Sequence, residues 1–235
     1  MSHMNVSHPG LVAAEARTDE RLAFIRRTYL HLFGSILIFT ILETLLFRSG
    51  VADTIAPKLF GGSSWIIVFL LFIGASWLAN WWAMSDASPA LQYAGLGLFI
   101  VAEAIIFLPL LYVAIHYGGG VDVIVSAGSV TAILCGVTTI FVFVTKKDFS
   151  FMGWALTLCS IGAFVLIILG IIFGWPMGAW FSGFMIILGL GYLLYSTSNV
   201  LHRYRTEQHV AASLALFAAV MLVFFYVLRL FLDRR

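Results

Sequence analysis

The chain has 235 residues with a formal net charge of +2, and its composition is 62% hydrophobic and only 10% charged. Soluble domains are about 45–50% apolar and about 25% charged, so a water-soluble fold has no place to bury this much apolar surface. The small net charge, with basic residues spread over the connecting segments, also argues against a nucleic acid partner.

Seven long apolar segments follow one another along the chain, separated by short polar or Gly- and Pro-containing connections. A membrane span needs about 20 mostly apolar residues, and a backbone in lipid must satisfy its own hydrogen bonds. A transmembrane β-barrel would instead show segments of about ten residues with alternating polarity. We therefore predict an all-α membrane protein with seven transmembrane helices, at about residues 29–48, 64–84, 91–116, 121–145, 150–174, 177–200 and 210–232.

The segment before the first span is polar. It contains Glu15, Asp19 and Glu20, and the apolar run that follows is of span length without a small-residue cleavage site, so we expect no secretory signal peptide. We interpret residues 1–20 as a flexible cytosolic tail and residues 21–235 as one transmembrane domain.

Basic residues set the expected orientation. With the N-terminus inside, the larger share of the 13 Lys and Arg residues falls on the inner side, as the positive-inside rule requires. We expect the N-terminus in the cytosol and the C-terminus outside. The inner residues are Arg17, Arg21, Arg26, Arg27, Lys146, Lys147, Arg203 and Arg205.

No pattern in the sequence indicates an enzyme, a cofactor or a bound metal. Cys135 and Cys159 lie deep in apolar segments, and the histidines lack the spacing of a metal site. The stretch "GASW" at Gly74–Trp77 only partly resembles the Gly-x-Ser-Gly of intramembrane serine proteases. We therefore expect a protein that is not an enzyme.

Glu103 stands near the middle of the third span, in "FIVAEAIIFLP". A charge there costs about 2.5–3.5 kcal/mol on insertion scales. Glu103 must face the bundle interior or a wet cavity, or stay protonated. Two interpretations remain open: a cation or proton ligand, or a protonated carboxyl that hydrogen-bonds a neighbouring helix.

Three further charged residues are secondary candidates. Glu43 and Arg229 lie near the outer ends of the first and last spans, where long side chains snorkel toward the interface. Asp148 lies in an inner connection, where a solvated loop charge is the ordinary expectation.

The sixth span ends in a cluster of uncharged polar residues, and its surroundings carry a family pattern. The stretches are "FVTKKDFSFMG" at Phe143–Gly153, "LLYSTSN" at Leu193–Asn199 and "FFYVLRLF" at Phe224–Phe231. Together they resemble the Bax inhibitor-1 family of seven-span membrane proteins, over about residues 24–232. The "TSN" after span six is most similar to the bacterial branch of that family.

The resemblance implies a bundle in which the last helix is wrapped by the other six, and a non-enzymatic role. Some family members leak calcium ions through a pore closed at its cytosolic side by two aspartates, at the end of span six and in span seven. Other bacterial members are linked to a membrane-anchored ATP-dependent protease.

The sequence departs from the leak pattern at both acid positions. Ser196 stands at the span-six position, and Ala219, ten residues before Arg229, stands at the span-seven position. A proton-sharing switch needs two coupled carboxylates, so it cannot operate here. The polar residues Ser196, Thr197, Ser198 and Asn199 can line a water path, or they can cap the helix and pack against the last span.

Two functional hypotheses follow. The first is a regulator of membrane-protein quality control or stress survival in the bacterial inner membrane, acting through membrane partners such as the protease. The second is a leak channel for calcium, another cation or protons, in which Glu103 replaces the missing acid pair. Both hypotheses place the protein in the lipid bilayer.

Overall fold

The computed structural model of the chain describes residues 12–59, 62–85, 88–175 and 177–233. Within these ranges the protein is helical apart from its connections and a two-residue bridge between Val12 and Arg205. The helices are α1 (Thr18–Arg48), α2 (Val51–Leu59), α3 (Gly62–Ala83), α4 (Pro89–His116), α5 (Val121–Thr145), the short 3₁₀ helix η1 (Ser150–Met152), α6 (Gly153–Phe173), α7 (Ala179–His202) and α8 (His209–Leu232).

Seven of the described helices are long and apolar enough to cross a membrane: α1 and α3 to α8. This confirms the predicted seven-span, all-α fold. The first span differs from its expected bounds, because α1 begins at Thr18 and takes in the lead-in before residue 29. Of the expected tail, residues 1–11 lie outside the described residues, while Ala13 donates its N–H to the Tyr204 carbonyl at 2.9 Å.

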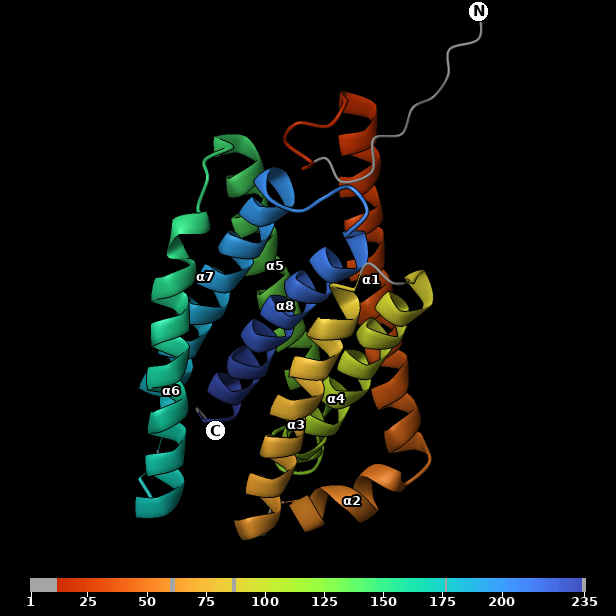
Figure 1. Cartoon of the computed structure of the whole chain (residues 1–235). Helices are drawn as coiled ribbons and strands as arrows, with labels where there is room; N and C mark the ends of the chain where they lie inside the picture. The colour runs from red at the N-terminus through yellow and green to blue at the C-terminus, as the bar shows by residue number, and fades with distance from the viewer. Residues whose placement is uncertain (1–11, 60–61, 86–87, 176, 234–235) are drawn as a thin grey trace, which may run out of the picture.

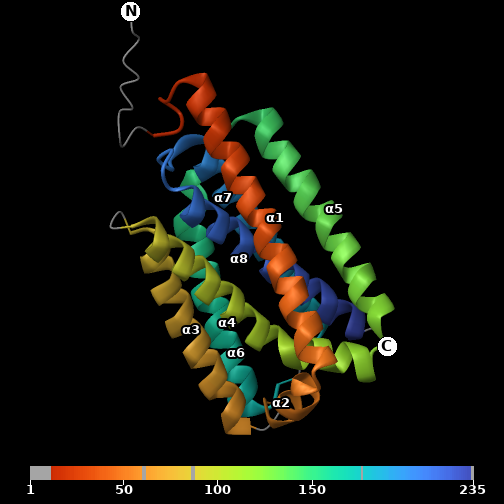
Figure 2. The ribbon, with the colours of Figure 1, turned by 90° about the vertical axis from the view of Figure 1, so that its right-hand side faces the viewer.

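The last helix, α8, lies in the middle of the bundle (Figures 1 and 2). It packs against α1, α3, α4, α5 and α7. Phe217 of α8 is fully buried and meets Phe39 of α1 and Phe99 of α4 edge-on, at ring-centroid distances of 6.4 and 6.0 Å. The expectation that six helices wrap the last one therefore needs a correction, because α6 packs mainly on α7 at the edge of the molecule (Figure 1).

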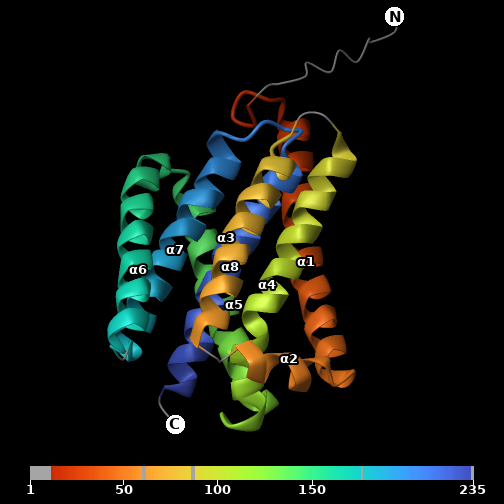
Figure 3. The same ribbon diagram turned by 60° about the horizontal axis from the view of Figure 1, so that its bottom comes forward.

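The connection between the first two spans contains a helix that the sequence analysis treated as a loop. α2 lies across one end of the bundle, at an angle to the spans (Figure 3). It buries Ala52 and Ala56 against Leu108 of α4, while Asp53 and Lys58 stay exposed. With nine residues this amphipathic helix is too short to span a bilayer. Hydropathy alone therefore does not identify it, and its contact with α4 is visible only in the structure.

α3 and α4 approach each other closely at Gly95. A Cβ atom added to Gly95 would lie 2.5 Å from the Ala79 carbonyl oxygen and 2.9 Å from the Ala83 nitrogen. Both contacts are with backbone, which cannot swing aside as a long side chain does. Gly95 therefore sets the distance between these two helices, as small residues commonly do in membrane bundles.

We predict that Gly95→Ala lowers the free energy of unfolding by about 1–3 kcal/mol, because the added methyl group forces α3 and α4 apart. Thermal unfolding in detergent measures this change. Gly97→Ala is the matched control, since a Cβ there meets nothing within 4 Å and alanine is the better helix former. Equal stabilities of the two variants would contradict the assigned role of Gly95.

Candidate functional site

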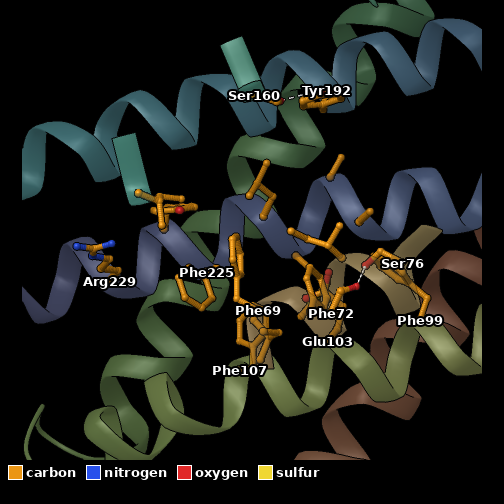
Figure 4. Close-up of a pocket in the computed structure, with 18 of the residues that line it drawn as sticks. Phe69, Phe72, Ser76, Phe99, Glu103, Phe107, Ser160, Tyr192, Phe225 and Arg229 are labelled. Atoms are coloured by element: carbon orange, nitrogen blue, oxygen red, sulfur yellow. Dashed lines mark hydrogen bonds between the residues drawn. The ribbon is translucent and has the colours of Figure 1, made fainter. Parts of the chain in front are cut away.

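A cavity of about 900 Å³ lies between α3, α4, α6, α7 and α8, within the membrane-spanning part of the bundle. Its walls are mostly aromatic and aliphatic. Polar groups reach it at a few places, which are labelled in Figure 4: Ser76, Glu103, Arg229, and the Ser160–Tyr192 pair, whose hydroxyl oxygens are 2.8 Å apart. The aromatic lining residues include Phe69, Phe72, Phe99, Phe107 and Phe225.

Glu103 of α4 faces this cavity. Its side chain is only 6% exposed, and no described residue forms a hydrogen bond with its carboxyl group. Ser76, its polar neighbour on the wall, donates its hydroxyl to the Phe72 carbonyl of its own helix at 2.7 Å. One interpretation of Glu103 is a protonated carboxyl group that hydrogen-bonds a neighbouring helix. Among the described residues, no side chain or backbone group of another helix forms such a bond. The cavity is where water, an ion or a ligand would meet this carboxyl group.

Among the α8 residues that line the cavity are two that the sequence analysis singled out, Ala219 and Arg229. Ala219, at the position where the resemblance expects an acid, is buried and lines the wall. Arg229 lies at the opposite end from Glu103 (Figure 4), and its guanidinium group donates a hydrogen bond to the carbonyl of Met177 in the α6–α7 connection. The cavity thus has one acidic and one basic residue at its two ends.

The polar cluster at the end of α7 does not line this cavity. Ser196, Thr197, Ser198 and Asn199 are all buried. Ser198 Oγ accepts the N–H of Phe149 at 2.8 Å and donates to the Lys147 carbonyl at 3.4 Å. The cluster therefore ties the end of α7 to the α5–α6 connection.

Asn199 does not cap α7 with its side chain. The helix continues to His202, and the Asn199 backbone carbonyl accepts the N–H groups of Arg203 and Tyr204. Its side-chain oxygen and Thr197 Oγ1 are buried without a hydrogen-bond partner among the described residues. Thr197 and Thr139 face the buried hydroxyl group of Tyr29 on α1.

Asp148 shapes the α5–α6 connection. Its Oδ1 accepts the N–H of Ser150 at 2.8 Å, at the start of η1. The hydrogen bonds from the Ser150 side chain and backbone, with smaller contributions from Arg203 and His202, hold the pKa of this exposed carboxyl group below its usual value. Asp148 is therefore ionised throughout the neutral range and serves as a turn-forming residue.

Glu43 is buried rather than snorkelling to the interface. Glu43 lies on the inward face of α1, one turn beyond the buried Phe39, and is 6% exposed. Both of its carboxyl oxygens lack a hydrogen-bond partner among the described residues.

The described part of the chain contains no group of three His, Cys, Asp or Glu side chains that could hold a metal ion. Calcium prefers six to eight oxygen ligands.

Three aromatic polar residues form a cluster, not indicated by any sequence motif, at the end of the bundle that carries the N-terminal segment. Tyr93 Oη of α4 lies 2.9 Å from His31 Nε2 of α1 and 3.5 Å from His209 Nε2 of α8. The two imidazole rings are 5.0 Å apart. These residues come from three distant segments without a shared motif, so only the fold brings them together.

A groove of about 540 Å³ adjoins this cluster. Its charged lining residues are Glu20, Arg27 and Glu207, and Tyr93 and His209 form part of the same wall. The groove lies at the end of the bundle where the N-terminal segment meets the α7–α8 connection. It is the more polar of the two pockets and lies apart from the apolar cavity.

The chain is similar to known proteins over most of its length. Residues 21–235 match the family model described as inhibitor of apoptosis-promoting Bax1. A BI1-like protein of Arabidopsis thaliana is 25% identical over 95% of this chain and 84% of its own length. Bax inhibitor 1 of Schizosaccharomyces pombe is 26% identical over 92% of this chain and 79% of its own length.

A bacterial relative shows similar coverage. An uncharacterised protein of Helicobacter pylori is 27% identical over 93% of this chain and 91% of its own length. The family match covers all seven spans, including α4 with Glu103 and the end of α7 with its polar cluster. The chain is an integral membrane protein and belongs to the Bax inhibitor-1 family.

Proposed function

We propose that this chain is a non-enzymatic membrane regulator that acts through contacts with other membrane proteins, in membrane-protein quality control or stress survival. The observation that supports it is the uncharged end of α7 at residues 196–199. The family resemblance assigns Ser196 and Ala219 to the two acid positions of calcium-leaking members, and neither side chain can carry a charge. At the same end, Ser198 bonds α7 to the backbone of the α5–α6 connection.

The partner that we propose is a membrane-anchored ATP-dependent protease, in the inner membrane of a bacterium. The N-terminus would lie in the cytosol, together with the α5–α6 and α7–α8 connections. The groove beside Tyr93 and His209 supports this choice, because Glu20, Arg27 and Glu207 offer charges of both signs to a protein surface. Such complementary charges steer association and fix the register of two partners.

A cation or proton leak is the second candidate, and Glu103 is the observation that favours it. An intramembrane carboxyl group that faces a cavity is a functional-site hypothesis by default. The apolar walls of the cavity argue against it, since a permeating cation needs a succession of oxygen ligands. Arg229 at the far end would also repel a cation.

We predict that deletion of residues 1–20 abolishes co-purification with the membrane-anchored protease, because it removes both the N-terminal segment and the Glu20 side chain of the groove. Deletion of residues 1–11 is the matched control, since it keeps the bond between Ala13 and Tyr204. Thermal unfolding of both proteins shows whether the bundle survives. Undiminished co-purification of the longer deletion would exclude the N-terminal segment as the contact.

We predict that the purified protein in liposomes gives no calcium or proton flux above empty liposomes, at pH 6 and at pH 8. Flux in the wild type that is lost in Glu103→Gln would instead support the leak. Glu43→Gln is the control, because Glu43 is equally buried but does not line the cavity. Asp148 stays ionised at both pH values because its pKa lies below its usual value, so this residue cannot cause a pH response between them.

We predict that Ser198→Ala destabilises the α5–α6 connection by about 1–3 kcal/mol, because the Phe149 N–H loses its acceptor. Hydrogen exchange of residues 146–152 should become faster while the exchange of α8 stays unchanged. Ser129→Ala serves for comparison, since the exposed Ser129 hydroxyl bonds only within its own helix. Unchanged exchange of residues 146–152 in Ser198→Ala would mean that this bond does not hold the connection in place.

A further inference from the structure

The apolar cavity is long as well as wide. Its lining follows α8 from Ala215 to Arg229, a distance of about 21 Å at 1.5 Å per helical residue. The hydrocarbon core of one membrane leaflet is about 15 Å thick, half of a bilayer core of about 30 Å. A volume of about 900 Å³ also lies within the range of about 300–1,000 Å³ in which pockets enclose most of an organic ligand. The cavity is therefore long enough for an extended hydrocarbon chain.

The surrounding bilayer lies next to this cavity. α3 and α6 both line it, yet they are not among the helix pairs that pack along their lengths. The contact recorded between them is the stacked ring pair Phe69–Phe164, at a centroid distance of 5.9 Å. The wall between these two helices is thus thin, and it consists of side chains that face hydrocarbon on the outside.

Arg229 gives the cavity one charged end at the depth of the lipid head groups. It lies in the last turn of α8 and bonds the Met177 carbonyl, between the exposed Trp175 and Trp180. Exposed tryptophans mark the level of the membrane interface. The guanidinium group of Arg229 is therefore at the height where phosphate groups of the bilayer lie.

The charge of Arg229 is unmatched within the described part of the chain. None of the described carboxylates forms an ion pair with it, including Asp233, one turn further along. A guanidinium group carries five N–H donors in a planar fork that fits a phosphate. The one recorded hydrogen bond, to Met177, leaves most of these donors for a ligand.

We infer that the cavity binds one acyl chain of an anionic phospholipid from the surrounding bilayer, with the lipid phosphate at Arg229. The chain enters between α3 and α6 and lies along the aromatic wall toward Phe99. The opposite orientation would bring the phosphate to Glu103, near the middle of the span, and away from the guanidinium group of Arg229. This inference goes beyond the regulator proposal and does not depend on it.

The test uses the full chain in liposomes of a neutral phospholipid that contain a small fraction of phosphatidylglycerol with a photoreactive group near the end of one acyl chain. After illumination, mass spectrometry locates the labelled peptides. Label is expected on residues that line the far end of the cavity, such as Phe72, Phe99 and Ile106. Label confined to exposed faces of the outer helices would overturn the inference.

Arg229→Gln should lower cavity labelling about tenfold, the effect of losing one charge-assisted hydrogen-bonded pair. Arg48→Gln removes the same charge from an exposed residue in the last turn of α1, outside the cavity, and should leave labelling unchanged. A diacylglycerol with the same photoreactive chain, used with the wild-type protein, should label the cavity about tenfold less because it lacks the phosphate. Equal labelling by the two probes would overturn phosphate recognition even if Arg229→Gln failed to fold.

Discussion

The structure depends on the burial of α8 on nearly every side. A helix in lipid satisfies its own backbone hydrogen bonds, so α8 can occupy the centre without help from polar side chains. Small residues such as Ala211, Ala212 and Ala219 are buried along it and allow neighbouring helices to approach. Toward α3 and α6 the small side chains of Ala215, Ala218 and Ala219 leave space, and the cavity forms there. One helix thus supplies both the core and the wall of the candidate site.

The seven spans could be predicted because length and hydropathy are sufficient to identify a membrane helix. The inner position of α8 was implied by the family resemblance, whereas hydropathy cannot separate a central helix from a peripheral one. α6, for example, is as apolar as the other spans but packs mainly on α7. The amphipathic α2 was missed because it is short. Its packing against Leu108 of α4 depends on the tertiary structure and has no signal in the local sequence.

The candidate site could be predicted only in part. Glu103 stands out in any reading of the sequence, because it is an acid in the middle of a span. Glu43 was assigned to the interface, although its spacing of four residues from the buried Phe39 already places both side chains on the inward face of α1. The cavity, the position of Arg229 within it, and the His31–Tyr93–His209 cluster depend on distances between helices. Such distances are set by packing and are not encoded in a local motif.

The two ends of the bundle differ in how they are held together. At the end that carries the N-terminal segment, hydrogen bonds join α1, α7, the α5–α6 connection and the α7–α8 connection, as in the contact between Ser198 and Phe149. At the opposite end, the recorded link between α8 and the connections is the bond from Arg229 to Met177. His116 Nε2 of α4 also lies 3.4 Å from Asp53 Oδ1 of α2 at that end. More of the recorded hydrogen bonds between different segments therefore lie at the end that carries the N-terminal segment.

The central position of α8 also has a consequence for biosynthesis. Chains are made from the N-terminus, so α8 leaves the ribosome after the other six described spans. Until it arrives, α1, α4, α5 and α7 lack the helix on which their inward faces pack. The bundle cannot assemble span by span around a growing core, as it could if its first helix were the central one. Synthesis of α8 is therefore the step that allows the other helices to reach their final arrangement.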